Sequence, residues 1–411
     1  MTRALAPFAL IAAFAVLSAV LTRDAPMSDL LATWLAGHFY GQGEVGQIYP
    51  ADTRLYTMQP PSDWTPLMRE RGYLFDIFPF IYPPLWAWVA AGIAAVLSPE
   101  GLFTIARVLN PLLIGATVWL AARATRGTLP PALFVGLGLI FIGFTNIGQV
   151  ALIYGQPQIL VSFLTVLAIE RARNGAPVWG GAVMALAASI KLYPALYALV
   201  WLLAGRWRIV AAFGVVGLAM GVLSIAVAGW PLHAAFLHQV RVIGDTVLLT
   251  KLNFSLDPVI GQLFLADRFT FAPQAPGEDG GWFLARKGPL WSAISGLGVI
   301  LSILLSGWLL RRSDDPLVWP LVMILGSLFT PLSWVYHYLA PVAFAPALLD
   351  RLGTRAGGLL LVLAFVPLLM PSMSVIDGLS PTALPFQGAS VLCLMILAGG
   401  FGWAVATNRA R

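Results

Sequence analysis

The chain has 411 residues, of which 59% are hydrophobic and only 10% are charged. Soluble domains carry about 25% charged residues, so this composition excludes an ordinary soluble enzyme and indicates a membrane protein. The formal net charge of +6 does not predict nucleic-acid binding, because the arginines stand in short clusters between hydrophobic runs, as the positive-inside rule describes.

Apolar runs close to the length of a membrane-spanning helix recur from one end of the chain to the other. They predict an all-α polytopic membrane protein with about 12 transmembrane helices. Residues 4–21 follow Arg3 and predict an uncleaved first span, since no small-residue cleavage site follows them. The later apolar segments are 77–97, 102–122, 131–149, 157–170, 177–191, 193–205, 209–229, 289–310, 316–332, 338–349, 356–370 and 385–406.

Two long hydrophilic segments interrupt this pattern, residues 22–76 and 231–288. Loops of this length usually carry function. Within them, residues 29–39 and 233–249 place apolar side chains on one helical face, which predicts amphipathic helices lying in the membrane interface. We therefore expect one integral membrane domain over residues 1–411, with a first outer loop at 22–76 and a second at 231–288.

Arginine clusters predict the orientation of the chain in the membrane. If their side is cytoplasmic, both long loops and every histidine lie outside. Arg123 and Arg126 then give residues 77–149 an odd number of crossings, so either one segment there is re-entrant or this pair breaks the rule. The clusters taken as cytoplasmic are Arg3, Arg171/Arg173, Arg206/Arg208, Arg311/Arg312, Arg351/Arg355 and Arg409/Arg411.

A lysine stands within the apolar stretch "AASIKLYPALYAL", residues 187–199. A charge in hydrocarbon costs at least about 2.5–3.5 kcal/mol, so an unpaired lysine without a task is not expected there. Pro194 disfavours helix at Tyr193 and predicts that the helix ends near Lys191, at the outer boundary of the membrane. The ammonium either snorkels to the interface or binds a phosphate, for which a compact cation with three donors is suited.

Asp29 in "MSDLLATW" has two interpretations. It complements the helix dipole in a first turn capped by Ser28, or it acts as a general base at the membrane surface. Other acids share the loop, so composition alone does not single out Asp29.

Further polar residues occur at predicted helix ends on the same outer side. Tyr82 in "FIYPPLWAW" and His337 in "PLSWVYHYLAP" are ordinary interfacial residues or face a polar headgroup. Gln156 in "IYGQPQIL" and Asn253 in "LTKLNFSLDPVI" either satisfy local backbone groups or hydrogen-bond a sugar. Arg241 lies on the polar face of the helix predicted at 233–249.

The sequence has neither a nucleotide-binding motif nor a metal-ligand motif. An enzyme with its polar loops outside the cell has no nucleotide-sugar supply there. If it transfers a group, the activated donor should arrive on a lipid.

The order of the motifs "SDLLATWLAG", "YPPLWA", "NIGQVALIYGQPQ", "IKLYP", "NFSLDP" and "WVYHYLAP" resembles glycosyltransferase family 87, from about residue 4 to 345. The resemblance implies a GT-C membrane fold and a polyprenyl-phosphate sugar donor, of which mannose is the best-known case. It also implies that Asp29 is the catalytic base, and that Lys191, Gln156 and His337 occupy the matching lysine, glutamine and histidine positions.

Together these observations predict an inverting, metal-independent glycosyltransferase without a cofactor, in the plasma membrane with its site facing outward. Asp29 would deprotonate an acceptor glycolipid or glycan in cell-envelope glycolipid biosynthesis. The donor phosphate would be held by Lys191, Tyr82, His337 and Arg241, and the sugar or acceptor by Gln156 and Asn253. A secondary transporter, or a lipid-carrier accessory protein without glycosyl transfer, is the alternative.

Overall fold

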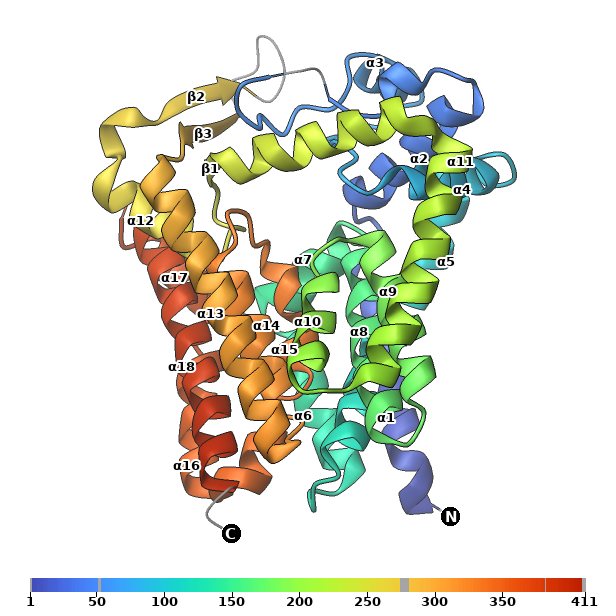
Figure 1. Ribbon diagram of the computed structural model, residues 1–411. Helices are drawn as coiled ribbons and strands as arrows, with labels where there is room; N and C mark the ends of the chain where they lie inside the picture. Colours follow the sequence, from blue (N-terminus) through green and yellow to red (C-terminus); the bar gives the residue numbers. More distant parts are fainter. Residues whose placement is uncertain (1, 51–52, 274–280, 381, 409–411) are drawn as a thin grey trace.

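The computed structural model describes residues 2–50, 53–273, 281–380 and 382–408. Helices that run side by side form a bundle, and shorter elements cover one end of it (Figure 1). The bundle helices are α1 (Thr2–Leu21), α5 (Pro99–Thr125), α6 (Pro131–Gly143), α7 (Asn146–Ile153), α8 (Gln158–Arg173), α9 (Pro177–Ile190), α10 (Ala195–Leu203), α11 (Trp207–Asp245), α13 (Pro289–Ser313), α14 (Val318–Phe329), α15 (Leu339–Val342), α16 (Ala347–Phe365) and α18 (Leu384–Asn408).

The covered end is called the loop end. Its elements are α2 (Ser28–Gly41), η1 (Val45–Gln47), α3 (Trp64–Glu70), α4 (Pro84–Ala94), β1 (Thr246–Leu249), α12 (Leu256–Phe264), η2 (Ala266–Arg268), β2 (Thr270–Pro273), β3 (Gly281–Arg286) and α17 (Met370–Asp377). One more short element, η3 (Val335–Tyr338), lies between α14 and α15.

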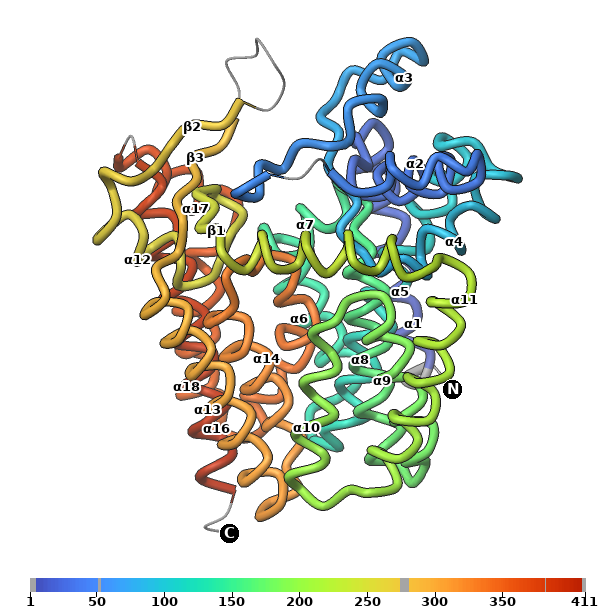
Figure 2. The backbone as a smooth tube through the Cα atoms, turned by 45° about the horizontal axis from the view of Figure 1, so that its top comes forward, coloured from blue at the N-terminus to red at the C-terminus, as the bar shows by residue number. Residues whose placement is uncertain are grey.

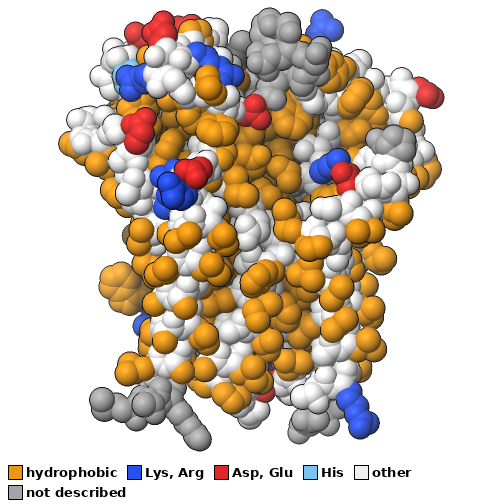
Figure 3. All heavy atoms as spheres, turned by 180° about the vertical axis from the view of Figure 1, so that it is seen from behind, with side chains coloured by type: hydrophobic (Ala, Val, Ile, Leu, Met, Phe, Trp, Pro, Cys, Tyr) orange, Lys and Arg blue, Asp and Glu red, His pale blue; other side chains and the backbone are white. Residues whose placement is uncertain are grey.

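Four helices of the described chain are long and apolar enough to cross a membrane, namely α5, α11, α13 and α18, and several shorter apolar helices accompany them. Seen from behind, the molecule carries a broad band of hydrophobic side chains, with most of its charged side chains towards the loop end (Figure 3). These features support a helical membrane protein. The predicted number of about 12 spans is not confirmed.

Several helices begin where the sequence places proline. Pro84, Pro99, Pro131, Pro177 and Pro289 occupy the first turn of α4, α5, α6, α9 and α13. Proline is tolerated there because the first-turn amides have no intrahelical acceptor.

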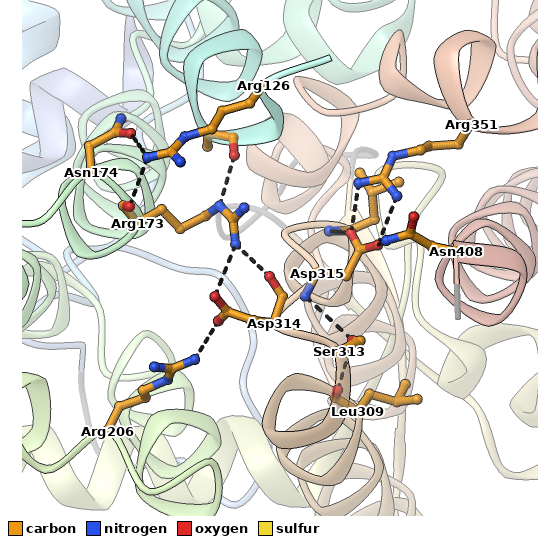
Figure 4. A network of polar contacts seen from close by, with 12 residues as sticks. Arg126, Arg173, Asn174, Arg206, Leu309, Ser313, Asp314, Asp315, Arg351 and Asn408 are labelled. Carbon is orange, nitrogen blue, oxygen red and sulfur yellow. Dashed lines mark hydrogen bonds and ion pairs between the residues drawn. The ribbon is translucent and has the colours of Figure 1, made fainter. Parts of the chain in front are cut away.

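The end of the bundle opposite the loop end carries a network of arginines and is called the arginine end (Figure 4). Arg126 donates to the Asn174 side chain at 2.6 Å, and Arg206 pairs with Asp314 at 2.6 Å. Arg351 pairs with Asp315 at 3.0 Å. Arg173, Arg206 and Arg351, which belong to three of the predicted arginine clusters, therefore lie at the same end of the molecule as Arg126. The predicted cluster at Arg409 and Arg411 lies outside the described residues.

The segment predicted as a span over 77–97 forms only α4, which has 11 residues. At 1.5 Å per residue α4 is about 16 Å long, too short for a hydrocarbon core of about 30 Å. It packs against α2 at the loop end (Figure 1). This short helix accounts for the odd number of crossings that the sequence predicted between residues 77 and 149.

Helix α11 bends sharply at Gly229 (φ 72°, ψ 159°), just before Pro231. Its first part runs along the bundle, and its second part lies across the loop end (Figures 1 and 2). The His233 ring fixes this bend, because its two nitrogens contact the Gly229 carbonyl at 2.7 Å and the Ser224 hydroxyl at 2.8 Å. The amphipathic helix predicted at 233–249 is thus the second part of α11, which ends at Asp245.

The prediction of an all-α chain did not include a small antiparallel sheet with strand order β1-β3-β2. Thr246 pairs with Arg286, and Thr270 pairs with Leu284. Residues 274–280, between β2 and β3, lie outside the described residues. The pairing of β1 with β3 joins segments that are distant in the sequence, so no local sequence pattern predicts it.

Candidate active site

The first turn of α2 docks on the turn that follows α7. The Asp29 and Leu30 amides donate to the Tyr154 carbonyl at 3.1 and 3.4 Å, and the Met27 amide donates to the Ile153 carbonyl at 3.0 Å. Amides in the first turn of a helix have no partner within the helix, so this turn satisfies them. The contact fixes Asp29 against the segment that contains Gln156.

Gly155 makes this close approach possible. Its φ of +63° lies in the left-handed region, and a Cβ there would come within 2.7 Å of the Met27 sulfur and 3.0 Å of the Leu30 Cβ. Glycine satisfies both demands, the conformation and the space.

Gln156 connects the first loop to the entrance of α4. Its side chain is buried and hydrogen-bonds the Asp29 carboxylate. The buried Tyr82 hydroxyl donates to Gln156 Oε1 at 3.5 Å. Gln156 therefore orients the Asp29 carboxylate.

Helix α9 ends at Ile190, and Lys191 follows in an extended conformation (φ −134°, ψ 136°). Its ammonium lies 5.5 Å from the centre of the Tyr82 ring and 5.2 Å from that of Tyr336. The predicted helix end at Lys191 is confirmed, and its charge lies against two aromatic faces, where cation–π attraction stabilises it.

The third member of this group, His337, comes from η3. Its Nε2 lies 3.4 Å from Lys191 Nζ, and its ring packs beside Tyr336 and Tyr193. Asp29, Lys191 and His337 each retain partial exposure to solvent, so the three polar groups line an accessible site instead of a sealed core.

A short bridge between two chain segments positions η3. Asn253 pairs with Trp334, and the Phe254 amide donates to the Ser333 carbonyl at 2.7 Å. Asn253 itself is fully buried; its Oδ1 accepts from the amides of Ser255 and Ser333, and its Nδ2 donates to the carbonyls of Leu248 and Pro331. The geometry favours the local backbone role for Asn253 over contact with a sugar.

Burial sets the protonation of the three site groups, which lie in the first turn of α2, just after the end of α9 and in η3. Burial raises the pKa of Asp29 to about 7, against the opposing effects of the Gln156 hydrogen bond and the Lys191 charge. Burial lowers the pKa of Lys191 to about 7, although the Asp29 carboxylate opposes this shift. The pKa of His337 is lowered well below its usual value by burial and by Lys191, so His337 is neutral and accepts from the ammonium.

The structure thus brings five of the predicted residues together, namely Asp29, Tyr82, Gln156, Lys191 and His337. Arg241 is instead exposed on the second part of α11 and has no contact with these five in the described structure. The predictions did not assign a role to Tyr336, whose ring borders Lys191. The position of Tyr336 next to His337 in "WVYHY" is the sequence feature that would have indicated such a role.

No group of three or more His, Cys, Asp and Glu side chains in the described residues is arranged to hold a metal ion. This finding does not test whether the reaction needs a metal, so metal-independent chemistry stays a prediction.

The Asp29 carboxylate and the Lys191 ammonium interact electrostatically but do not form an ion pair among the described residues. Both groups are therefore available to a ligand.

The family model for glycosyltransferase family 87 matches residues 80–333, more than half of the chain. The matched range includes Tyr82, Gln156, Lys191 and Asn253, whereas Asp29 precedes it and His337 follows it. Among curated proteins, none matches the chain significantly.

Proposed function

The chain belongs to glycosyltransferase family 87 and is a membrane glycosyltransferase, and we propose that it transfers a sugar from a polyprenyl-phosphate donor to a hydroxyl of a glycolipid or glycan. Mannose is the first sugar to test. In this proposal the site faces the outside of the plasma membrane, at the loop end. The observation that carries it is the convergence of Asp29, Lys191 and His337 from three distant segments at one accessible place.

Asp29 is the base in this reaction. Its carboxylate takes the proton from the acceptor hydroxyl as the acceptor oxygen attacks the anomeric carbon of the sugar. The bond from that carbon to the phosphate oxygen breaks on the opposite face, so the configuration inverts. A pKa of about 7 leaves Asp29 partly ionised at neutral pH and makes it a stronger base than an ordinary carboxylate.

Lys191 is the group that stabilises the leaving phosphate. When the bond breaks, the electron pair stays on the phosphate oxygen, and the ammonium offsets this charge. His337 accepts from Lys191 and orients it, because the neutral ring offers a lone pair at Nε2. Tyr82 and Tyr336 form the walls beside the ammonium.

An apolar groove of about 310 Å³ between α4, α9 and α11 supports a lipid-linked donor. Pro83 and Leu192 line it, and these residues are the chain neighbours of Tyr82 and Lys191. In this proposal the isoprenoid chain, still bonded to the phosphate, lies in this groove beside the site, where its apolar surface is shielded from water.

The test is transfer from radiolabelled polyprenyl-phosphate mannose to a membrane extract by protein reconstituted in liposomes. We expect transfer by the wild type, a loss of about 10²–10⁴-fold in Asp29→Asn, and retention in Asp63→Asn. Asp63 is the matched control because it is an exposed acid of the same loop. Absence of transfer from every lipid-linked sugar tried would reject the proposed donor class.

A further inference from the structure

A second cavity lies at the arginine end, far along the bundle from Asp29 and Lys191. It has a volume of about 660 Å³, and its charged lining residues are Arg173, Arg206, Arg208 and Asp314. Three guanidinium groups and one carboxylate give this lining a net charge of +2. None of these residues takes part in the proposed transfer.

Two of the three guanidinium groups are held in place by contacts within the protein. Figure 4 shows Arg173 and Arg206 pointing at Asp314 from two different segments, the end of α8 and the start of α11. Arg206 pairs with the Asp314 carboxylate at 2.6 Å, and Arg173 donates to the Asp314 backbone carbonyl at 2.5 Å. Asp314 therefore holds two guanidinium groups in place but neutralises only one charge.

Arg208 carries a positive charge that Asp314 does not neutralise. It is exposed, and within the described residues it makes neither a hydrogen bond nor an ion pair with another side chain. A guanidinium offers five donors, so Arg208 can bind an anion without breaking an existing contact.

The polar cavity continues into an apolar groove. This groove has a volume of about 870 Å³ and shares Gly175, Pro177 and Arg208 with the cavity. Elsewhere it is lined by apolar residues of α9 and α11, among which Trp179 and Val215 are 68% and 70% exposed. Exposed large apolar side chains on such helices indicate contact with lipid, because their exposure to water is unfavourable.

We propose that this compound site binds an anionic phospholipid, with its phosphate between Arg208 and Arg206 and an acyl chain in the groove along α9 and α11. A basic cavity between membrane helices suits an acidic headgroup, and the groove begins at the residue that carries the unpaired charge. Trp207, next to Arg208, is 66% exposed, and an exposed indole beside a basic side chain is typical of a membrane interface.

The experiment measures lipid binding to the full-length protein by native mass spectrometry. Short-chain phosphatidylglycerol is the probe, short-chain phosphatidylcholine tests charge, and inorganic phosphate tests whether the ion alone suffices. We expect phosphatidylglycerol to bind at least about tenfold more tightly than phosphatidylcholine, and inorganic phosphate not to compete with it at equal concentration.

Two variants test the two halves of the site. Arg208→Gln removes the unpaired charge and should weaken phosphatidylglycerol binding about fivefold. Ala211→Trp fills the groove from an exposed position of α11 and should weaken it by a similar factor. Arg311→Gln is the matched control, since Arg311 is exposed at the same end but does not line the cavity.

Three results would overturn this inference. Equal binding of phosphatidylcholine would show only a lipid-covered helix surface. Displacement by inorganic phosphate, with no effect of Ala211→Trp, would show a site for free anions. Equal losses in Arg311→Gln and Arg208→Gln would show a diffuse effect of surface charge.

Discussion

The ammonium of Lys191 lies 3.4 Å from Nε2 of His337, although 146 residues separate them in the chain. Both residues follow a helix that runs to the loop end, α9 for Lys191 and α14 for His337. A neutral imidazole beside an ammonium is a favourable pair, because one accepts and the other donates. A protonated imidazole at this distance would repel Lys191, and the lowered pKa of His337 prevents this.

Replacement of His337 tests this pair. We expect His337→Ala to lower kcat/KM for the lipid donor by about 10–100-fold, since a hydrogen bond to a charged group contributes about 1.5–3 kcal/mol. His337→Gln should recover part of the loss, because its side-chain oxygen can accept from Lys191. The measurement is initial rate against donor concentration, and equal activity of the Ala and Gln variants would argue against an acceptor role.

Replacement of Lys191 tests the proposed phosphate contact. Lys191→Met should lower kcat/KM for the donor by about 10²–10³-fold, because it removes the charge that offsets the leaving phosphate. It should also raise the pKa of Asp29, which Lys191 lowers in the wild type, so the acid limb of the pH profile should move to higher pH.

Lys251→Met is the control for that variant. Lys251 is an exposed lysine that pairs with Asp377 at 2.7 Å, outside the site. It should retain wild-type donor kinetics. If Lys191→Met did so too, Lys191 would have no role in binding the phosphate.

The pKa values near 7 predict a bell-shaped pH profile. Below about pH 7, Asp29 becomes protonated and cannot accept a proton from the acceptor; above about pH 7, Lys191 loses its charge. kcat/KM should therefore be greatest near pH 7 and fall on both sides. A bound phosphate anion raises both pKa values, so the profile of kcat should lie at higher pH than that of kcat/KM.

Arginine at position 191 separates the two limbs. Lys191→Arg keeps its charge at every accessible pH, so the alkaline limb should disappear while the acid limb remains. An alkaline limb that persisted in this variant would have to come from a group other than Lys191.

Local sequence rules predicted several elements of the structure correctly. Pro194 predicted the end of α9 at Lys191, and the apolar face at 29–39 predicted α2. The segment 77–97 failed as a span for an equally local reason. Pro79, Pro83 and Pro84 exclude helix before residue 84, so an apolar run of sufficient length yields only the short α4.

The assembly of the site was beyond such rules. Asp29 meets Gln156 because the first turn of α2 docks on the Tyr154 carbonyl, a contact between segments more than a hundred residues apart. Asn253 looked like a sugar ligand because amides often bind hydroxyls. Its burial and its four backbone partners depend on the bridge to Ser333, which only the folded chain reveals.

Gly155 offers the sharpest test of how Asp29 is positioned. Gly155→Ala adds a methyl group that would meet the Met27 sulfur at 2.7 Å, and it forces a left-handed conformation that costs about 1–3 kcal/mol. Because α2 must shift to relieve the contact, the Asp29 carboxylate should move away from its position. Displacement of a catalytic group by about 1 Å can lower a rate about 10²-fold.

Gly43→Ala separates displacement from backbone strain, because Gly43 also has a left-handed φ (+80°) but nothing within 4 Å of an added Cβ. Both variants should lose thermal stability, whereas only Gly155→Ala should lose about 10²-fold in kcat at a temperature where both remain folded. Its donor KM should change little, since Lys191 and His337 belong to other segments. Full activity in folded Gly155→Ala would mean that Asp29 does not depend on this contact, and a comparable loss in Gly43→Ala would assign the effect to backbone strain instead.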